Sequence, residues 1–143
     1  MQRAAPASAR QPYWKPKPRA KAAPAPIGAA KRVIQRNEEA AYRTLEGLWR
    51  LHRIDWWHCT IAQRSQPGWP DFVVFGKGWL AFVEVKARQA SGRMGRFDEE
   101  RQGRYRDSIV SGGGEYVLLK MPDELEVHNA WLRERTGIEV VLQ

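Results

Sequence analysis

The sequence has few of the residues that hold small secreted or metal-stabilised domains together. It contains one cysteine, Cys59, and three histidines in 143 residues. A single cysteine excludes an internal disulfide, and these four residues do not show the spacing of a zinc site. No apolar run is long enough to span a bilayer, and the N-terminus lacks the apolar core of a secretory signal. We therefore expect a cytoplasmic protein, in a reducing compartment and without a membrane partner.

Acidic residues are missing from the first quarter of the chain. Residues 1–36 hold nine of the 24 basic residues and none of the 16 acidic ones, which leaves the remainder close to neutral. Residues 1–32 are rich in Ala, Pro, Lys and Arg, a composition typical of solvated, disordered chain. We predict a basic tail that binds a polyanion, most simply nucleic acid, followed by one domain over residues 33–143. Removing residues 1–30 should make that binding weaker and less sensitive to salt.

The periodicity of apolar residues predicts an α/β domain. The expected helices are 33–52, 98–111 and 123–135, and the expected strands are 56–62, 71–75, 79–86, 115–119 and 138–142. The last helix should bury Leu125, Trp131, Leu132 and one of Val127 and His128. This order predicts a mixed sheet flanked by helices.

Two charged motifs stand at strand ends in this pattern. Asp71 follows Pro70, and twelve residues separate it from the triplet Glu84-Val85-Lys86. Glu84 and Lys86 share a strand face because side chains alternate along a strand. A hairpin through residues 76–78 would bring Asp71 opposite Glu84. Two carboxylates and an ammonium group should therefore meet on one patch.

Such a patch suits metal-assisted hydrolysis of a phosphodiester. Mg²⁺ prefers carboxylate oxygens and commonly uses one or two of them with water and substrate phosphate. A lysine beside the metal can orient water or offset negative charge in the transition state. The simpler interpretation is an ordinary solvent-facing ion pair between strands. Three charges gathered at the end of an apolar run favour the metal site.

These residues resemble a known family. Pro70-Asp71 with Glu84-Val85-Lys86 is similar to the PD-(D/E)XK nuclease superfamily, and the run Gly68-Trp69-Pro70-Asp71 is similar to its VRR-NUC branch. The resemblance spans roughly residues 34–120. It implies a restriction-endonuclease-like αβββαβ core and a Mg²⁺- or Mn²⁺-dependent endonuclease acting on DNA. Small stand-alone members are associated with phage and resemble structure-specific nucleases, including Holliday-junction resolvases.

The resemblance also implies roles for individual residues. Asp71 and Glu84 would bind the metal with the backbone carbonyl of Val85, and Lys86 would activate the hydrolytic water. A glutamate of the first helix completes the site in this family. Glu38 lies about 20° from Leu45 on a helical projection and is our candidate, with Glu39 as the alternative. Gln102 matches a family glutamine near the metal.

Several arginines are candidates for contacts with the DNA backbone: Arg88, Arg93 and Arg96 in the loop after Lys86, and Arg101 and Arg104 on the second helix. Each has a simpler role as a solvated charge or, for Arg104, as a partner of Glu100. A junction resolvase would need a symmetric homodimer, and the sequence leaves the oligomeric state open. The alternative function is a non-catalytic nucleic-acid-binding module on the same fold.

Overall fold

The computed structural model describes residues 29–59 and 67–143, with side chains from Asn37 onward. The elements are α1 (Ala29–Leu51), β1 (Asp55–His58), β2 (Phe72–Gly76), β3 (Trp79–Ala87), α2 (Gln102–Ser111), β4 (Glu115–Met121) and α3 (Leu125–Thr136). Within this part of the chain, no helix combines the length and the apolar character needed to cross a membrane. Residues 1–28 of the predicted tail lie outside the described residues.

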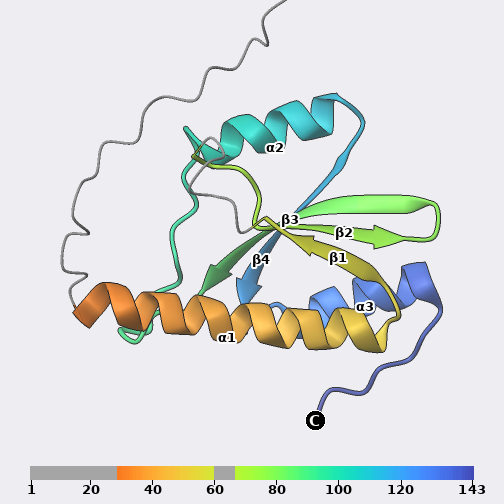
Figure 1. Ribbon diagram of the computed structural model, residues 1–143, viewed down its shortest axis with the longest axis horizontal. Helices are drawn as coiled ribbons and strands as arrows, with labels where there is room; N and C mark the ends of the chain where they lie inside the picture. Colours follow the sequence, from red (N-terminus) through yellow and green to blue (C-terminus); the bar gives the residue numbers. More distant parts are fainter. Residues whose placement is uncertain (1–28, 60–66) are drawn as a thin grey trace, which may run out of the picture.

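The strands form one mixed sheet in the order β1-β2-β3-β4. β1 and β3 both pair antiparallel with β2, whereas β3 and β4 pair in parallel after the chain returns through α2. In Figure 1, α1 and α3 lie on one face of the sheet and α2 lies on the other. The predicted α/β class, with a mixed sheet flanked by helices, is confirmed.

The apolar stripe of α1 covers the sheet as the helical periodicity predicts. Leu45 and Trp49 are fully buried. The Trp49 ring packs edge to face against Phe72 of β2, with 5.0 Å between the ring centroids. The indole N–H of Trp49 also donates to Nε2 of buried His128 in α3, at 2.9 Å. Fully burying one such side chain contributes about 1.5–3 kcal/mol to the stability of the fold. Because Trp49 also bonds to His128, it holds α1 and α3 on the same face of the sheet.

All three predicted helix starts differ from the structure, and α3 begins at Leu125 instead of residue 123. α1 begins at Ala29, four residues before the predicted start. α2 begins at Gln102 instead of residue 98, because the Asp98 carboxylate accepts the N–H of Arg101 at 3.0 Å. Aspartate side chains that bond nearby backbone N–H groups favour a turn before a helix.

The predicted strand over residues 56–62 corresponds to β1, which runs from Asp55 to His58. Residues 60–62 of that prediction lie outside the described residues.

The predicted strand over residues 138–142 is wrong. This segment is irregular, although Val140 and Leu142 pack against the core. The side-chain amide of Asn129 in α3 donates to the Val140 carbonyl at 2.8 Å, so a side chain takes the bond that a neighbouring strand would supply.

The sequence leaves open whether Val127 or His128 of α3 is buried in the core. His128 is the buried residue, whereas Val127 is 68% exposed.

Candidate functional site

The hairpin formed by β2 and β3 brings Asp71 next to the Glu84-Val85-Lys86 triplet. Phe72 pairs with Val83, so Asp71 precedes β2 at the level of Glu84. The backbone N–H of Val85 donates to Oδ2 of Asp71 at 2.8 Å. Lys86 lies on the same face as Glu84, with its Nζ 2.7 Å from Oε1 of that carboxylate. The three charged groups therefore form one contiguous cluster.

Burial makes this cluster electrostatically unusual. Glu84 is only 2% exposed. Burial, followed by the nearby charge of Asp71, raises the pKa of Glu84 to about 7 against the opposing effect of Lys86. Burial also raises the pKa of Asp71, although the Val85 N–H, Lys86 and the Tyr42 hydroxyl act in the opposite direction. The two carboxyl groups do not readily ionise at the same time. A proton shared between them, or a cation bound to both, would stabilise the pair.

One carboxylate oxygen of the cluster has no hydrogen-bond partner. Among the described residues, Oε2 of Glu84 is buried and has no hydrogen-bond partner. The hydroxyl of Tyr116 in β4 is likewise buried without a partner, and burial, followed by the charges of Glu84 and Asp71, raises its pKa. An unpartnered buried oxygen is rare in a folded domain and needs an explanation. A hard divalent cation suits this donor set, because it prefers carboxylate oxygens.

Glu38 lies close to the cluster, whereas Glu39 points to solvent. Glu38 is half-buried, and its pKa is raised first by burial and then by Asp71, with Lys86 opposing. However, within residues 29–59 and 67–143 no three acidic, histidine or cysteine side chains converge closely enough to form a metal-binding group. The structure thus brings Asp71 and Glu84 together and leaves Glu38 at the rim.

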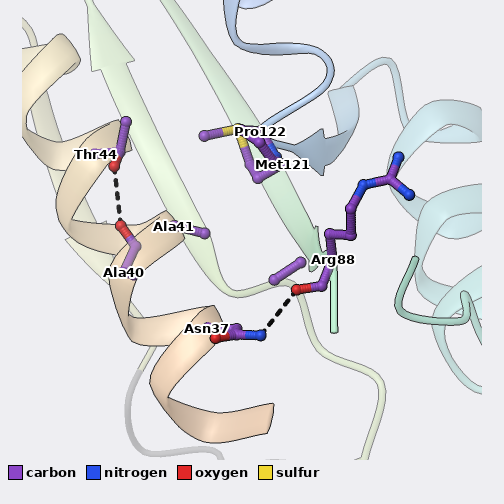
Figure 2. Close-up of a pocket in the computed structure, with 8 residues that line it drawn as sticks. Asn37, Ala40, Ala41, Thr44, Arg88, Met121 and Pro122 are labelled. Atoms are coloured by element: carbon purple, nitrogen blue, oxygen red, sulfur yellow. Dashed lines mark hydrogen bonds between the residues drawn. The ribbon is translucent and has the colours of Figure 1, made fainter. Parts of the chain in front are cut away.

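A contact between α1 and the end of β3 sets the position of Glu38. The side-chain amide of Asn37 donates to the carbonyl of Arg88 at 3.0 Å (Figure 2). Since Glu38 follows Asn37 directly, this bond fixes the helix turn that carries Glu38. A pocket of about 280 Å³, lined in part by Ala87 and Met121, lies between α1 and the ends of β3 and β4. Figure 2 shows Ala41 and Met121 beside it. That pocket lies on the α1 face, whereas Glu84 and Lys86 face α2.

Gln102 connects the first turn of α2 to the cluster. Its amide group donates to Oε1 of Glu84, and its carbonyl oxygen accepts the backbone N–H of Asp98 at 2.8 Å. The same turn that delays the start of α2 therefore orients Gln102 toward Glu84.

The candidate DNA-binding arginines have different surroundings. The Arg88 guanidinium bonds to Asp123 and to the carbonyl of Gly92, so an acidic neighbour already neutralises it. Arg93 and Arg96 are exposed in the loop after β3. Arg101 lies 4.0 Å from Asp98, and Arg104 lies over the Tyr105 ring. The five arginines therefore differ in how much of their charge is already neutralised by neighbours.

Two neighbours of the cluster are not evident from the sequence. Tyr42 hydrogen-bonds Asp71 through its hydroxyl, but its spacing in α1 predicts only a core side chain. Lys120 of β4 pairs in register with Lys86 of β3. Lys120 lies next to Lys86 because β3 and β4 pair in parallel, and α2 separates these two strands along the chain. No local sequence pattern therefore indicates this contact.

Comparisons with protein-family models, with curated proteins and with solved structures find no match to this chain. The similarity to the VRR-NUC family therefore rests on the motif residues alone and stays a prediction.

Proposed function

We propose that this chain is a metal-dependent endonuclease that hydrolyses phosphodiester bonds of DNA. One observation carries the proposal: a buried, unpartnered oxygen of Glu84 lies in a cluster with Asp71 and the ammonium group of Lys86. A structural ion pair with Lys86 needs only one carboxylate, whereas two adjacent carboxylates supply the ligands that a divalent cation prefers. We infer further that the sheet and helices form a restriction-endonuclease-like core of the VRR-NUC type.

In this proposal each residue of the cluster has one role. Asp71 and Glu84 would hold Mg²⁺ or Mn²⁺ together with the carbonyl of Val85, and Glu38 would contribute from the rim, directly or through water. The bound cation supplies Lewis-acid polarisation of the phosphoryl oxygen and lowers the pKa of a water. Lys86 orients the attacking water and offsets charge that develops on the phosphate. Gln102 keeps Glu84 in place through its amide group.

DNA retention is a separate property in this account. The folded body is close to neutral, so the basic N-terminal segment and exposed arginines such as Arg93, Arg96 and Arg101 supply attraction to the backbone. Backbone contacts do not select a sequence. We therefore expect cutting directed by DNA structure, as at branches, flaps or junctions, in the cytoplasm. Symmetric cleavage of a junction would need a homodimer.

The test is cleavage of end-labelled linear and four-way-junction DNA with Mg²⁺, with Mn²⁺ or with EDTA. Wild type should nick DNA only with metal, and Asp71→Ala should abolish nicking. Tight DNA binding without cleavage in either metal would favour the alternative, a non-catalytic binding module. Nicking that Asp71→Ala leaves unchanged would contradict the proposal.

A further inference from the structure

A second cavity opens next to Lys86 on the α2 face of the sheet. It has a volume of about 400 Å³. Its charged lining comes from β3, β4, α2 and the segments beside them: Lys86, Arg88, Glu99, Arg106, Lys120 and Asp123. Phe97 and Leu118 supply apolar parts of its wall. The cavity therefore shares Lys86 with the carboxylate cluster and extends away from it along β4.

Most of the basic groups in this cavity already have acidic partners. Arg88 bonds to Asp123, and Arg106 lies 3.0 Å from Glu99. Lys86 contacts Glu84 at 2.7 Å. In the part of the chain that the structure describes, Lys120 is the lysine of this cavity whose ammonium group forms no ion pair. The nearby carboxylate of Glu124 accepts the backbone N–H of Lys120 at 2.9 Å.

The register of the sheet makes an anion favourable at this point. Lys86 and Lys120 are directly paired neighbours on parallel strands, so their side chains leave the same face of the sheet. Like charges at paired positions are destabilising by themselves. Lys120 is exposed and stands in a β4 segment whose flanking residues, Leu119 and Met121, are buried. Glu84 already pairs with Lys86, so an anionic group at this point would be attracted chiefly by Lys120.

We propose that this cavity binds a phosphate group of the nucleic-acid backbone, with Lys120 as its main contact. The inference rests on the proposed function, and it adds a site for a phosphate neighbouring the one that is cut. Lys86 is shared between the two positions, so a phosphate held at Lys120 would lie beside the Asp71–Glu84 cluster. Lys120 is a substrate-binding residue in this account and has no role in the chemical step.

Binding measured without cleavage tests this site independently of the proposed activity. The full-length protein is titrated with labelled DNA in EDTA over a series of salt concentrations. The variants are Lys120→Gln, Lys120→Arg and, as a matched control, Lys77→Gln in the turn between β2 and β3. Lys120→Gln should weaken binding about three- to tenfold and reduce the salt slope by about 0.9, the value for one lost phosphate contact. Lys120→Arg should restore both, and Lys77→Gln should change neither.

The source of the phosphate is tested with inorganic phosphate at constant ionic strength. It should displace DNA less effectively from Lys120→Gln than from wild type if the cavity recognises the phosphate group itself. Equal salt slopes for wild type and Lys120→Gln would overturn the proposal, as would equal losses in Lys120→Gln and Lys77→Gln. Failure of metal-dependent cleavage would leave these binding results intact and would count only against the endonuclease proposal.

Discussion

The carboxylate of Asp71 accepts the backbone N–H of Val85 at 2.8 Å, and this bond joins the start of β2 to the centre of the Glu84-Val85-Lys86 triplet. The bond has two effects. It fixes the position of Asp71 relative to Glu84, and it partly offsets the effect of burial on the pKa of Asp71. The two carboxyl groups are therefore held together although their charges repel.

Asp71→Asn should keep the stability of the fold and abolish DNA nicking. An asparagine oxygen can still accept the Val85 N–H, but the variant loses the charge that helps to raise the pKa of Glu84. In EDTA at pH 8 we expect the Tm of the variant to be equal to or above that of wild type. Mg²⁺ should raise the Tm of wild type more than that of Asp71→Asn, because cation binding stabilises the native state. DNA nicking should be lost.

Calorimetry with and without Mg²⁺ and a nicking assay on the same samples check this prediction. The conservative control is Asp55→Asn, which changes an exposed aspartate at the edge strand β1. A variant at position 71 that is clearly less stable than wild type in EDTA would mean that the Asp71 charge serves the fold instead of a cation.

Local sequence patterns predict most of the fold and the centre of the site. The helical spacing of Leu45 and Trp49 identifies the buried face of α1, and strand alternation with the short turn places Glu84 and Lys86 together. The pairing of Lys86 with Lys120 is not predictable in this way, because it depends on how α2 returns the chain. Likewise, the partner of Arg88 is Asp123, 35 residues further along the chain.

Gly68 controls the loop that delivers Asp71. Its φ of +97° is unfavourable for other residues, and a Cβ atom there would lie 2.6 Å from backbone atoms of Arg101. Gly68→Ala should cost about 1–3 kcal/mol through strain and should also lower nicking, because the loop must shift. Gly47 in α1 is the matched control, since a Cβ atom added there would have no neighbouring atom within 4 Å. Gly47→Ala should stabilise the protein by about 0.5–1 kcal/mol.

Urea unfolding and nicking rates measured for both variants check this pair. Equal stability changes at the two positions would contradict the argument that Gly68 is required for the packing of the loop against α2.

His128 should make stability depend on pH. Burial, with the charges of His52 and Arg135, lowers the pKa of His128 from 6.5 to about 4. Between these values the unfolded state binds more protons than the folded state, so the free energy of unfolding rises with pH from about 4 to 6.5 and then levels. The full effect is on the order of 3 kcal/mol. Glu84 acts in the opposite direction as pH rises toward 7, because its folded pKa is raised.

The contribution of His128 is therefore isolated by a difference measurement. His128→Gln keeps an acceptor for the Trp49 N–H but cannot titrate. The free energy of unfolding of wild type minus that of His128→Gln should rise between pH 4 and 6.5 and stay constant above. If the unfolding free energies of wild type and His128→Gln changed with pH in parallel across that interval, His128 would bind its proton equally well in the folded and the unfolded state.

The most direct test of the account compares Lys86→Met with Lys77→Met in a nicking assay at saturating DNA and Mg²⁺. Both substitutions remove one ammonium group, but only Lys86 lies in the cluster, 2.7 Å from Glu84. We predict that Lys86→Met nicks about 10²–10⁴ times more slowly than wild type, that it still binds DNA, and that Lys77→Met is unaffected. Nicking by Lys86→Met at the wild-type rate would contradict the proposed site.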